Sequence, residues 1–93
     1  MSFMIRFDQG TVTVDQYHAI NQGLEDAGQG NPVGREFHVG YVEEDGSLSV
    51  VDIWDSMENF EKFGETLMPV LETVGADAGE PTILSVDTII CPD

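Results

Sequence analysis

Two residues of this chain are of the types that carry out acid–base chemistry in an apolar setting: His38 and Asp52. Histidine accepts a proton near neutral pH, which makes His38 the best candidate for a general base. Asp52 interrupts the apolar segment from Val50 to Trp54, and a carboxylate buried there needs a partner. We therefore predict His38 as the proton acceptor and Asp52 as an orienting charge. The structural alternative is a core histidine with one hydrogen bond to the backbone.

The face of the sheet that carries His38 depends on the turn that follows it. The dipeptide Asp45-Gly46 supplies the positive φ angle of a tight hairpin turn. A two-residue loop would pair His38 with Ile53, which puts His38 on the face opposite to Asp52. A β-bulge in the strand would reverse this assignment, so both placements stay open at this point.

Charged residues on neighbouring strands could serve Asp52 as partners. The predicted strand order places Arg6 on the first strand between Asp52 and Asp87, which lie on the third and fourth strands. This predicted ion cluster has two interpretations. It lines a seam between two subunits, or Arg6 and Asp87 help to orient a bound ligand.

Aromatic side chains are numerous enough to wall a pocket for a flat substrate. We predict Tyr17, Trp54 and Phe63 as substrate-binding walls beside the polar residues. Aromatic residues at such spacings also form ordinary hydrophobic cores, and this is the alternative for the whole set. The set comprises Tyr17, Phe37, Tyr41, Trp54, Phe60 and Phe63.

Motifs that would hold a metal, a nucleotide or another cofactor are missing from the sequence. His18 and His38 have no His-x-His or HExxH spacing, so no metal site is predicted. There is no P-loop and no GxSxG motif, and the glycines at 28 and 30 follow a predicted helix rather than a strand. The single Cys91 cannot form an internal disulfide. We expect no cofactor.

The charge of the chain restricts its partners. Eighteen acidic residues stand against three basic ones, for a net charge of −15, which argues against nucleic acids and anionic membranes as partners. Acids scattered along a folded chain suit concentrated salt, which screens their repulsion, and a salt-adapted host is our hypothesis. No apolar run approaches the ~18 residues of a membrane span, and the N-terminus lacks a signal-peptide pattern. We expect a cytoplasmic protein.

The elements that must position these residues follow from hydrophobic periodicity and from start and stop signals. Thr13 and Gln16 predict a capping box at the start of the first helix. Asp55 and Glu58 predict another at the start of the second, where Ser56 is also a good N-cap, and Pro69 predicts a kink or break. The predicted strands are Phe3–Phe7, Arg35–Val42, Leu48–Trp54 and Thr82–Ile90, and the predicted helices run from Thr13 to Ala27 and from about Ser56 to Gly75.

The order βαββαβ predicts a single α+β domain over residues 1–93, with both helices on one face of a four-stranded antiparallel sheet. The right-handed crossover rule places the first strand centrally, between the third and the fourth. The other sheet face also carries apolar residues and would be uncovered in a monomer. Packing of sheet on sheet covers it most simply, so we expect a homodimer. The pocket walled by aromatic residues leads us to expect a small-molecule ligand.

Several short segments, taken with the order of the elements, match a known pattern. They are Phe37-His38-Val39, Asp45-Gly46, the run from Val51 to Ser56 with Phe60 and Phe63, and Pro69 before an isoleucine-rich last strand. The chain thereby resembles the dimeric α/β-barrel superfamily, and within it the small antibiotic-biosynthesis-monooxygenase type domains. The resemblance implies a ferredoxin-like protomer that dimerises through its sheet, with a small-molecule cavity between sheet and helices. Members include cofactor-free oxygenases of aromatic substrates, lactone isomerases and haem-degrading enzymes.

The haem-degrading branch of this superfamily differs from the chain at its functional positions. Those members carry an Asn in the first strand, a Trp in the helix after the third strand, and an iron-binding His further along that region. The matching positions here hold Arg6 or Phe7, then Phe63, and then residues near Thr73. Haem degradation is therefore not expected.

These inferences combine into two hypotheses of different classes. The first is a homodimeric, cofactor-independent enzyme that oxygenates or isomerises a small aromatic or enolisable compound, with His38 as its base. Such chemistry needs a base, an oriented dry pocket and an electron-rich substrate. The second is a non-catalytic dimeric module that binds a metabolite or serves assembly.

Overall fold

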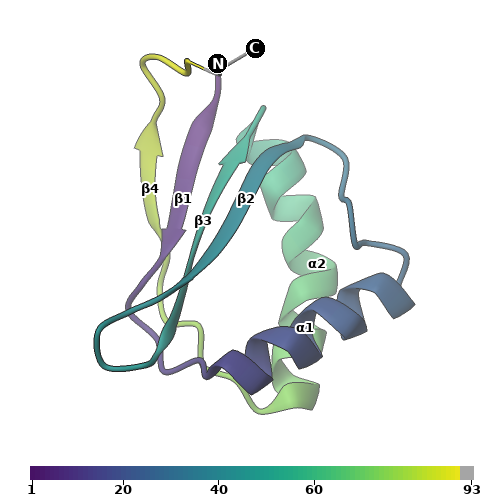
Figure 1. Cartoon of the computed structure of the whole chain (residues 1–93). Helices are drawn as coiled ribbons and strands as arrows, with labels where there is room; N and C mark the ends of the chain where they lie inside the picture. Colours follow the sequence, from purple (N-terminus) through teal and green to yellow (C-terminus); the bar gives the residue numbers. More distant parts are fainter. Residues whose placement is uncertain (91–93) are drawn as a thin grey trace.

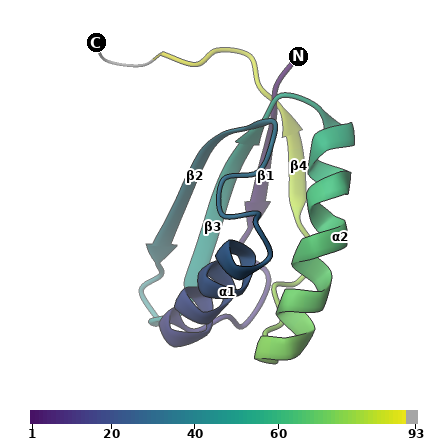
Figure 2. The ribbon, with the colours of Figure 1, turned by 90° about the vertical axis from the view of Figure 1, so that its right-hand side faces the viewer.

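The chain folds into six elements in the order βαββαβ, and the computed structural model describes residues 1–90. Both helices lie on one face of the sheet and leave the other face open (Figure 1 and Figure 2). This confirms the predicted ferredoxin-like α+β class. The elements are β1 (Phe3–Phe7), α1 (Val14–Asp26), β2 (Arg35–Val42), β3 (Leu48–Trp54), α2 (Met57–Val74) and β4 (Thr82–Ser85).

The sheet is antiparallel throughout, with the strand order β2-β3-β1-β4. β1 therefore lies between β3 and β4, as the crossover rule predicts. Ile5 of β1 lies opposite Asp52 of β3 and Ile83 of β4. Because residues that lie opposite each other point to the same side of a sheet, this register decides which side chains face the helices.

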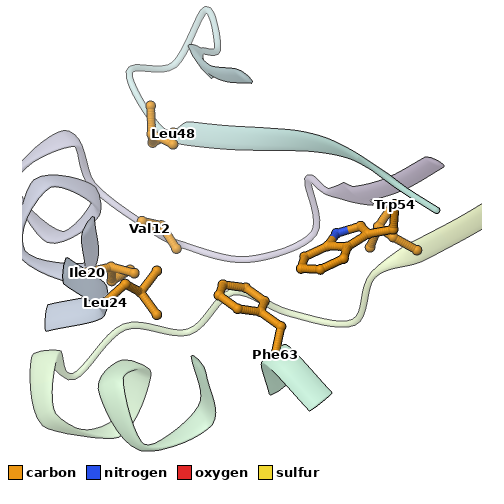
Figure 3. Close-up of a cluster of buried hydrophobic side chains, with 7 residues drawn as sticks. Val12, Ile20, Leu24, Leu48, Trp54 and Phe63 are labelled. Carbon is orange, nitrogen blue, oxygen red and sulfur yellow. The ribbon is translucent and has the colours of Figure 1, made fainter. Parts of the chain in front are cut away.

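The hydrophobic core fills the space between the sheet and the helices. Ile5 and Trp54 are fully buried, and the Trp54 ring contacts Phe63 at 5.2 Å between centroids. In Figure 3, Phe63 lies between the Trp54 end of the cluster and the end formed by α1. The buried apolar set is Ile5, Val12, Ile20, Leu24, Leu48, Trp54 and Phe63.

Capping determines where the helices begin. The predicted capping box of α1 is confirmed, since Thr13 Oγ1 accepts from the Gln16 N–H and Gln16 Oε1 accepts from the Thr13 N–H. α2 is capped by Ser56, whose hydroxyl accepts from the Asn59 N–H at 3.2 Å. The predicted capping box that starts at Asp55 is therefore wrong.

Two other predicted features of the second half of the chain differ from the structure. Of the kink or break predicted at Pro69, the break is not found, since α2 continues to Val74. β4 ends at Ser85 and not at Ile90, because β1, its only partner strand within residues 1–90, begins at Phe3. One further hydrogen bond continues the pairing, from the Val86 N–H to the Ser2 carbonyl. Cys91 lies outside the described residues.

The hairpin between β2 and β3 has a loop of three residues, Glu44 to Gly46, and not of two. The Glu43 N–H donates to the Ser47 carbonyl at 2.8 Å, and Gly46 has a φ of 90°. A turn followed by a glycine in the left-handed region is the usual three-residue hairpin. Hydrogen bonds from the Ser47 hydroxyl and backbone hold the pKa of Asp45 below its ordinary value. The loop shifts the register of β2 by one residue from the prediction.

Candidate functional site

The shifted register brings His38 directly opposite Asp52, on the face covered by the helices. The predicted pairing of His38 with Ile53 is therefore wrong. His38 Nδ1 lies 2.6 Å from Asp52 Oδ1, and the Asp52 side chain is 4% exposed. Because an ionised carboxylate can only accept hydrogen bonds, Nδ1 carries the proton, and the Nδ1–H donates a hydrogen bond to Asp52 Oδ1. The buried carboxylate thus has its partner in a histidine and not in an arginine.

Tyr17 of α1 completes the environment of the imidazole. Its hydroxyl lies 2.6 Å from His38 Nε2, and the two rings stack at 5.9 Å between centroids and 15° between planes. With the proton on Nδ1, a neutral imidazole accepts the Tyr17 O–H at Nε2. Gly40 permits this approach, since a Cβ at that position would lie 2.7 Å from the Tyr17 hydroxyl oxygen.

Trp54 holds the other oxygen of the buried carboxylate. The indole Nε1–H donates a hydrogen bond to Asp52 Oδ2 at 3.4 Å. Trp54 lies two residues after Asp52 on β3, and so on the same face of the sheet. Trp54 is fully buried and is not among the residues that line the cavity described below. Its place is therefore behind the carboxylate rather than beside a substrate. Tyr17, His38, Asp52 and Trp54 form one continuous chain of hydrogen bonds, contributed by α1, β2 and β3.

A cavity opens beside this hydrogen-bonded chain, between the sheet and the helices. Its inner chamber, of about 70 Å³, is mostly apolar and reaches Tyr17, His38, Asp52 and Phe63. An outer chamber of about 230 Å³ adjoins it and shares His38 and Arg35 with it. Each chamber alone is smaller than the ~300–1,000 Å³ typical of small-molecule sites. The predicted wall residues Tyr17 and Phe63 and the predicted base His38 thus line the same chamber as Asp52.

Arg35 lines both chambers, and sequence reasoning did not select it. A β-bulge between Arg35 and Phe37 lets Arg35 lie opposite Trp54 while Phe37 lies opposite Ile53. Regular alternation would put Arg35 and His38 on opposite faces, because they are three residues apart. The bulge places them on the same face. No residue type near Glu36 marks a bulge in the sequence, so the only available signal was the scarcity of basic residues.

The predicted cluster of Arg6 with Asp52 and Asp87 is not found. Arg6 lies opposite Val51 and Thr82, which puts it on the open face, because it is Ile5 that lies opposite Asp52. Arg6 Nε is 3.1 Å from Asp8 Oδ2, an ion pair without hydrogen-bond geometry. Asp87 follows the end of β4 and is exposed. Neither residue reaches the cavity.

The remaining aromatic residues divide between the two faces of the sheet. Phe60 packs against Trp54 on the helix-covered side. Phe37 is 53% exposed on the open face, and Tyr41, four residues further along β2, lies on the same face. Within residues 1–90 no group of three potential metal ligands comes together. In the same part of the chain no helix is long and apolar enough to cross a membrane.

Comparison with known proteins finds similarity at the level of structure alone. No family model matches the sequence, and no curated protein is similar to it. SnoaB, a cofactor-independent oxygenase from Streptomyces nogalater, has a similar structure, with a TM-score of 0.63 at 14% identity over 96% of this chain and 94% of that one. A point variant of SnoaB gives a TM-score of 0.61 at 13% identity, over the same shares of the two chains.

A protein from Mycobacterium tuberculosis, Rv0793, extends this comparison. Its TM-score is 0.52 at 13% identity, over 99% of this chain and 97% of that one. At such identities the likeness establishes the fold. It confirms the ferredoxin-like fold that the sequence resemblance implied, and this fold is shared with SnoaB and Rv0793.

Proposed function

We propose that this chain binds a small aromatic or enolisable molecule in the cavity beside His38 and oxygenates or isomerises it without a cofactor. The observation that carries the proposal is the chain of hydrogen bonds from Asp52 through His38 to Tyr17, which ends at an apolar cavity. An oriented carboxylate behind an imidazole is a common way to prepare a general base.

The geometry supports a proton path through Tyr17. Tyr17 lines the inner chamber, and its hydroxyl donates to His38 Nε2. A substrate C–H or O–H that reaches the Tyr17 oxygen can lose its proton to that oxygen while the Tyr17 proton passes to Nε2. Asp52 then stabilises the imidazolium. In oxygenation, molecular oxygen is the oxidant: it adds to the carbon of the resulting carbanion, the peroxide anion takes up the proton held on His38, and loss of water from the hydroperoxide leaves a carbonyl group. In isomerisation, the proton returns to a different carbon. These are the two reaction types proposed.

The surroundings of the relay favour such chemistry. Leu24, Leu48 and Phe63, all buried, lie among the residues of the inner chamber. Excluding water strengthens electrostatic interactions at the reacting centre and protects reactive intermediates from side reactions. A carbanion formed next to Tyr17 would therefore meet a dissolved gas or the returning proton rather than bulk water.

The proposal is tested by incubating the protein with a panel of single-ring and two-ring hydroxyarenes and 1,3-dicarbonyl compounds in air. We expect at least one compound to be converted faster than in protein-free buffer, followed by an oxygen electrode and by mass spectrometry of the product. A gain of oxygen identifies oxygenation, and an unchanged mass with a new retention time identifies isomerisation. Binding of panel members without conversion would contradict the enzyme proposal.

One observation favours the second candidate, a non-catalytic dimeric module that binds a metabolite or serves assembly. His38 Nε2 is already occupied by the Tyr17 hydroxyl, and the inner chamber of about 70 Å³ holds little more than a few water molecules. In such a module the hydrogen-bonded chain would specify the packing of α1 on the sheet. Compounds of the panel would then bind in the outer chamber and remain unchanged.

We further propose that the protein is a homodimer formed through the open face of the sheet. Apolar side chains on that face include Phe37, 53% exposed, Val39, 38% exposed, and Leu84, 45% exposed. Large apolar side chains exposed along one sheet face are typical of an interface, and identical copies pair most often about a two-fold axis.

Val39→Asp should therefore convert the dimer to a monomer, because it buries a carboxylate without a partner within the proposed interface. Light scattering after size exclusion at micromolar concentration measures the change. The matched control is Val33→Asp, at a loop position that is 82% exposed, and it should leave the dimer intact. A monomeric wild-type protein would contradict the proposal, and circular dichroism verifies that both variants are folded.

A further inference from the structure

The three basic residues of the chain have different surroundings. Arg6 pairs with Asp8 at 3.1 Å, and Lys62 pairs with Glu58 at 3.8 Å on the exposed side of α2. Arg35 has no carboxylate at salt-bridge distance among residues 1–90, although the chain carries eighteen acidic residues. The one cation without an acidic partner in this part of the chain is thus the cation that lines the cavity.

Packing holds the Arg35 side chain in place without using up its donors. Its guanidinium lies over the Phe63 ring at 5.7 Å from the centroid, and Nη2 donates to the Gly30 carbonyl at 3.2 Å. A guanidinium has several further N–H donors in a planar fork that matches a carboxylate. Arg35 therefore presents an oriented and permanently charged guanidinium next to an apolar chamber.

We infer that the cavity binds a small aromatic carboxylate, with its carboxylate on Arg35 and its ring directed toward the inner chamber and Tyr17. The inference rests on the proposed function, since it names the class of ligand for the same site. Arg35 takes the role of orienting charge that sequence analysis gave to Arg6. Arg35 lies opposite Trp54 and His38 lies opposite Asp52. A ligand whose carboxylate binds Arg35 would therefore place its other end near His38.

Glu25 makes the site selective for a singly charged ligand. This exposed residue of α1 also lines the outer chamber, and the whole chain carries a net charge of −15. Both repel anions, and a phosphate with two charges is repelled more strongly than a carboxylate with one. A monocarboxylate is therefore the anion for which attraction to Arg35 most exceeds repulsion by Glu25 and by the net charge of the chain.

The test is an isothermal titration of the protein with 4-hydroxybenzoate and with 4-hydroxybenzamide, which have similar shapes and differ in charge. We expect the wild-type protein to bind the benzoate at least about ten times more tightly, because hydrogen bonds to an ionised acceptor are stronger than neutral ones. Arg35→Gln should remove this preference and leave the affinity for the benzamide unchanged. Arg6→Gln is the matched control, since it removes the same charge from the other face of the sheet, and it should retain the preference.

Glu25→Gln gives a second readout in a protein that keeps Arg35. It should tighten the binding of 4-hydroxybenzoate several-fold and leave 4-hydroxybenzamide unaffected, so the test survives a failure of Arg35→Gln to fold. The inference is overturned if wild-type protein binds both probes equally, binds neither, or keeps its preference after Arg35→Gln. Equal binding of both probes would leave the proposed enzyme intact. A wild-type preference for the benzoate that Arg35→Gln abolishes, without turnover of any compound, would remove the enzyme and keep the anion site.

Discussion

Replacing His38 by glutamine should lower the turnover of any substrate found in the panel by about 10²–10⁴-fold, the usual contribution of a general base. A glutamine amide can still donate to Asp52 Oδ1, as the imidazole Nδ1–H does at 2.6 Å, but it cannot take up a proton. Glutamine is chosen over alanine because alanine would leave the buried Asp52 carboxylate without its partner and lower the stability as well. Initial rates at saturating substrate measure the effect.

The matched control for this experiment is His18→Gln. His18 also neighbours Tyr17, with 5.8 Å between the ring centroids, but it is exposed and is not among the residues that line the cavity. Turnover should remain within about two-fold of the wild-type rate, since the exposed imidazole lies outside the relay. Equal rates for wild-type protein and His38→Gln would show that His38 is not the base.

Elements defined by local signals were predicted from the sequence almost without error. The bounds of β1, β2 and β3 agree with the prediction, because alternation and β-branched residues are properties of the segment itself. The start of α1 agrees for the same reason, since the capping box of Thr13 and Gln16 lies within four residues. The end of β4 did not, because a strand ends where its neighbour ends, and β1 lies almost eighty residues earlier in the chain.

The sequence predicted which residues form the candidate site but not which of their side chains contact one another. His38, Asp52, Tyr17 and Phe63 were selected by chemistry, and all four reach the cavity. Which of them touch was decided by the register of one hairpin, where the choice between two and three loop residues moves His38 from one face of the sheet to the other.

Arg35 was missed for a related reason. A single unpaired residue, Glu36, reverses the face on which Arg35 lies, and a bulge depends on how two strands meet rather than on one segment. Charge scarcity pointed to Arg6 and Arg35 equally. Only the paired register separates the arginine on the open face from the arginine in the cavity.

Asp52→Ala should destabilise the folded protein by about 2–5 kcal/mol, because each buried donor that loses its acceptor costs about 1–3 kcal/mol. The change leaves His38 Nδ1 and the Trp54 indole N–H without their acceptor, and it empties space beside a fully buried tryptophan. Against a total stability of about 5–15 kcal/mol for a small domain, this would bring the chain close to unfolding at 25 °C. Urea unfolding followed by Trp54 fluorescence measures it.

Asp52→Asn separates the charge of this residue from its shape. An asparagine can accept from His38 Nδ1 with its one amide oxygen, but its NH₂ group then faces the Trp54 N–H, so two donors meet where one acceptor stood. The expected cost is about 1–2 kcal/mol, that of one lost hydrogen bond in a buried site. A ranking in which asparagine is as harmful as alanine would mean that Asp52 acts through its charge alone. A ranking in which neither change matters would contradict the hydrogen-bonded chain itself, because two of its three hydrogen bonds are made by this carboxylate.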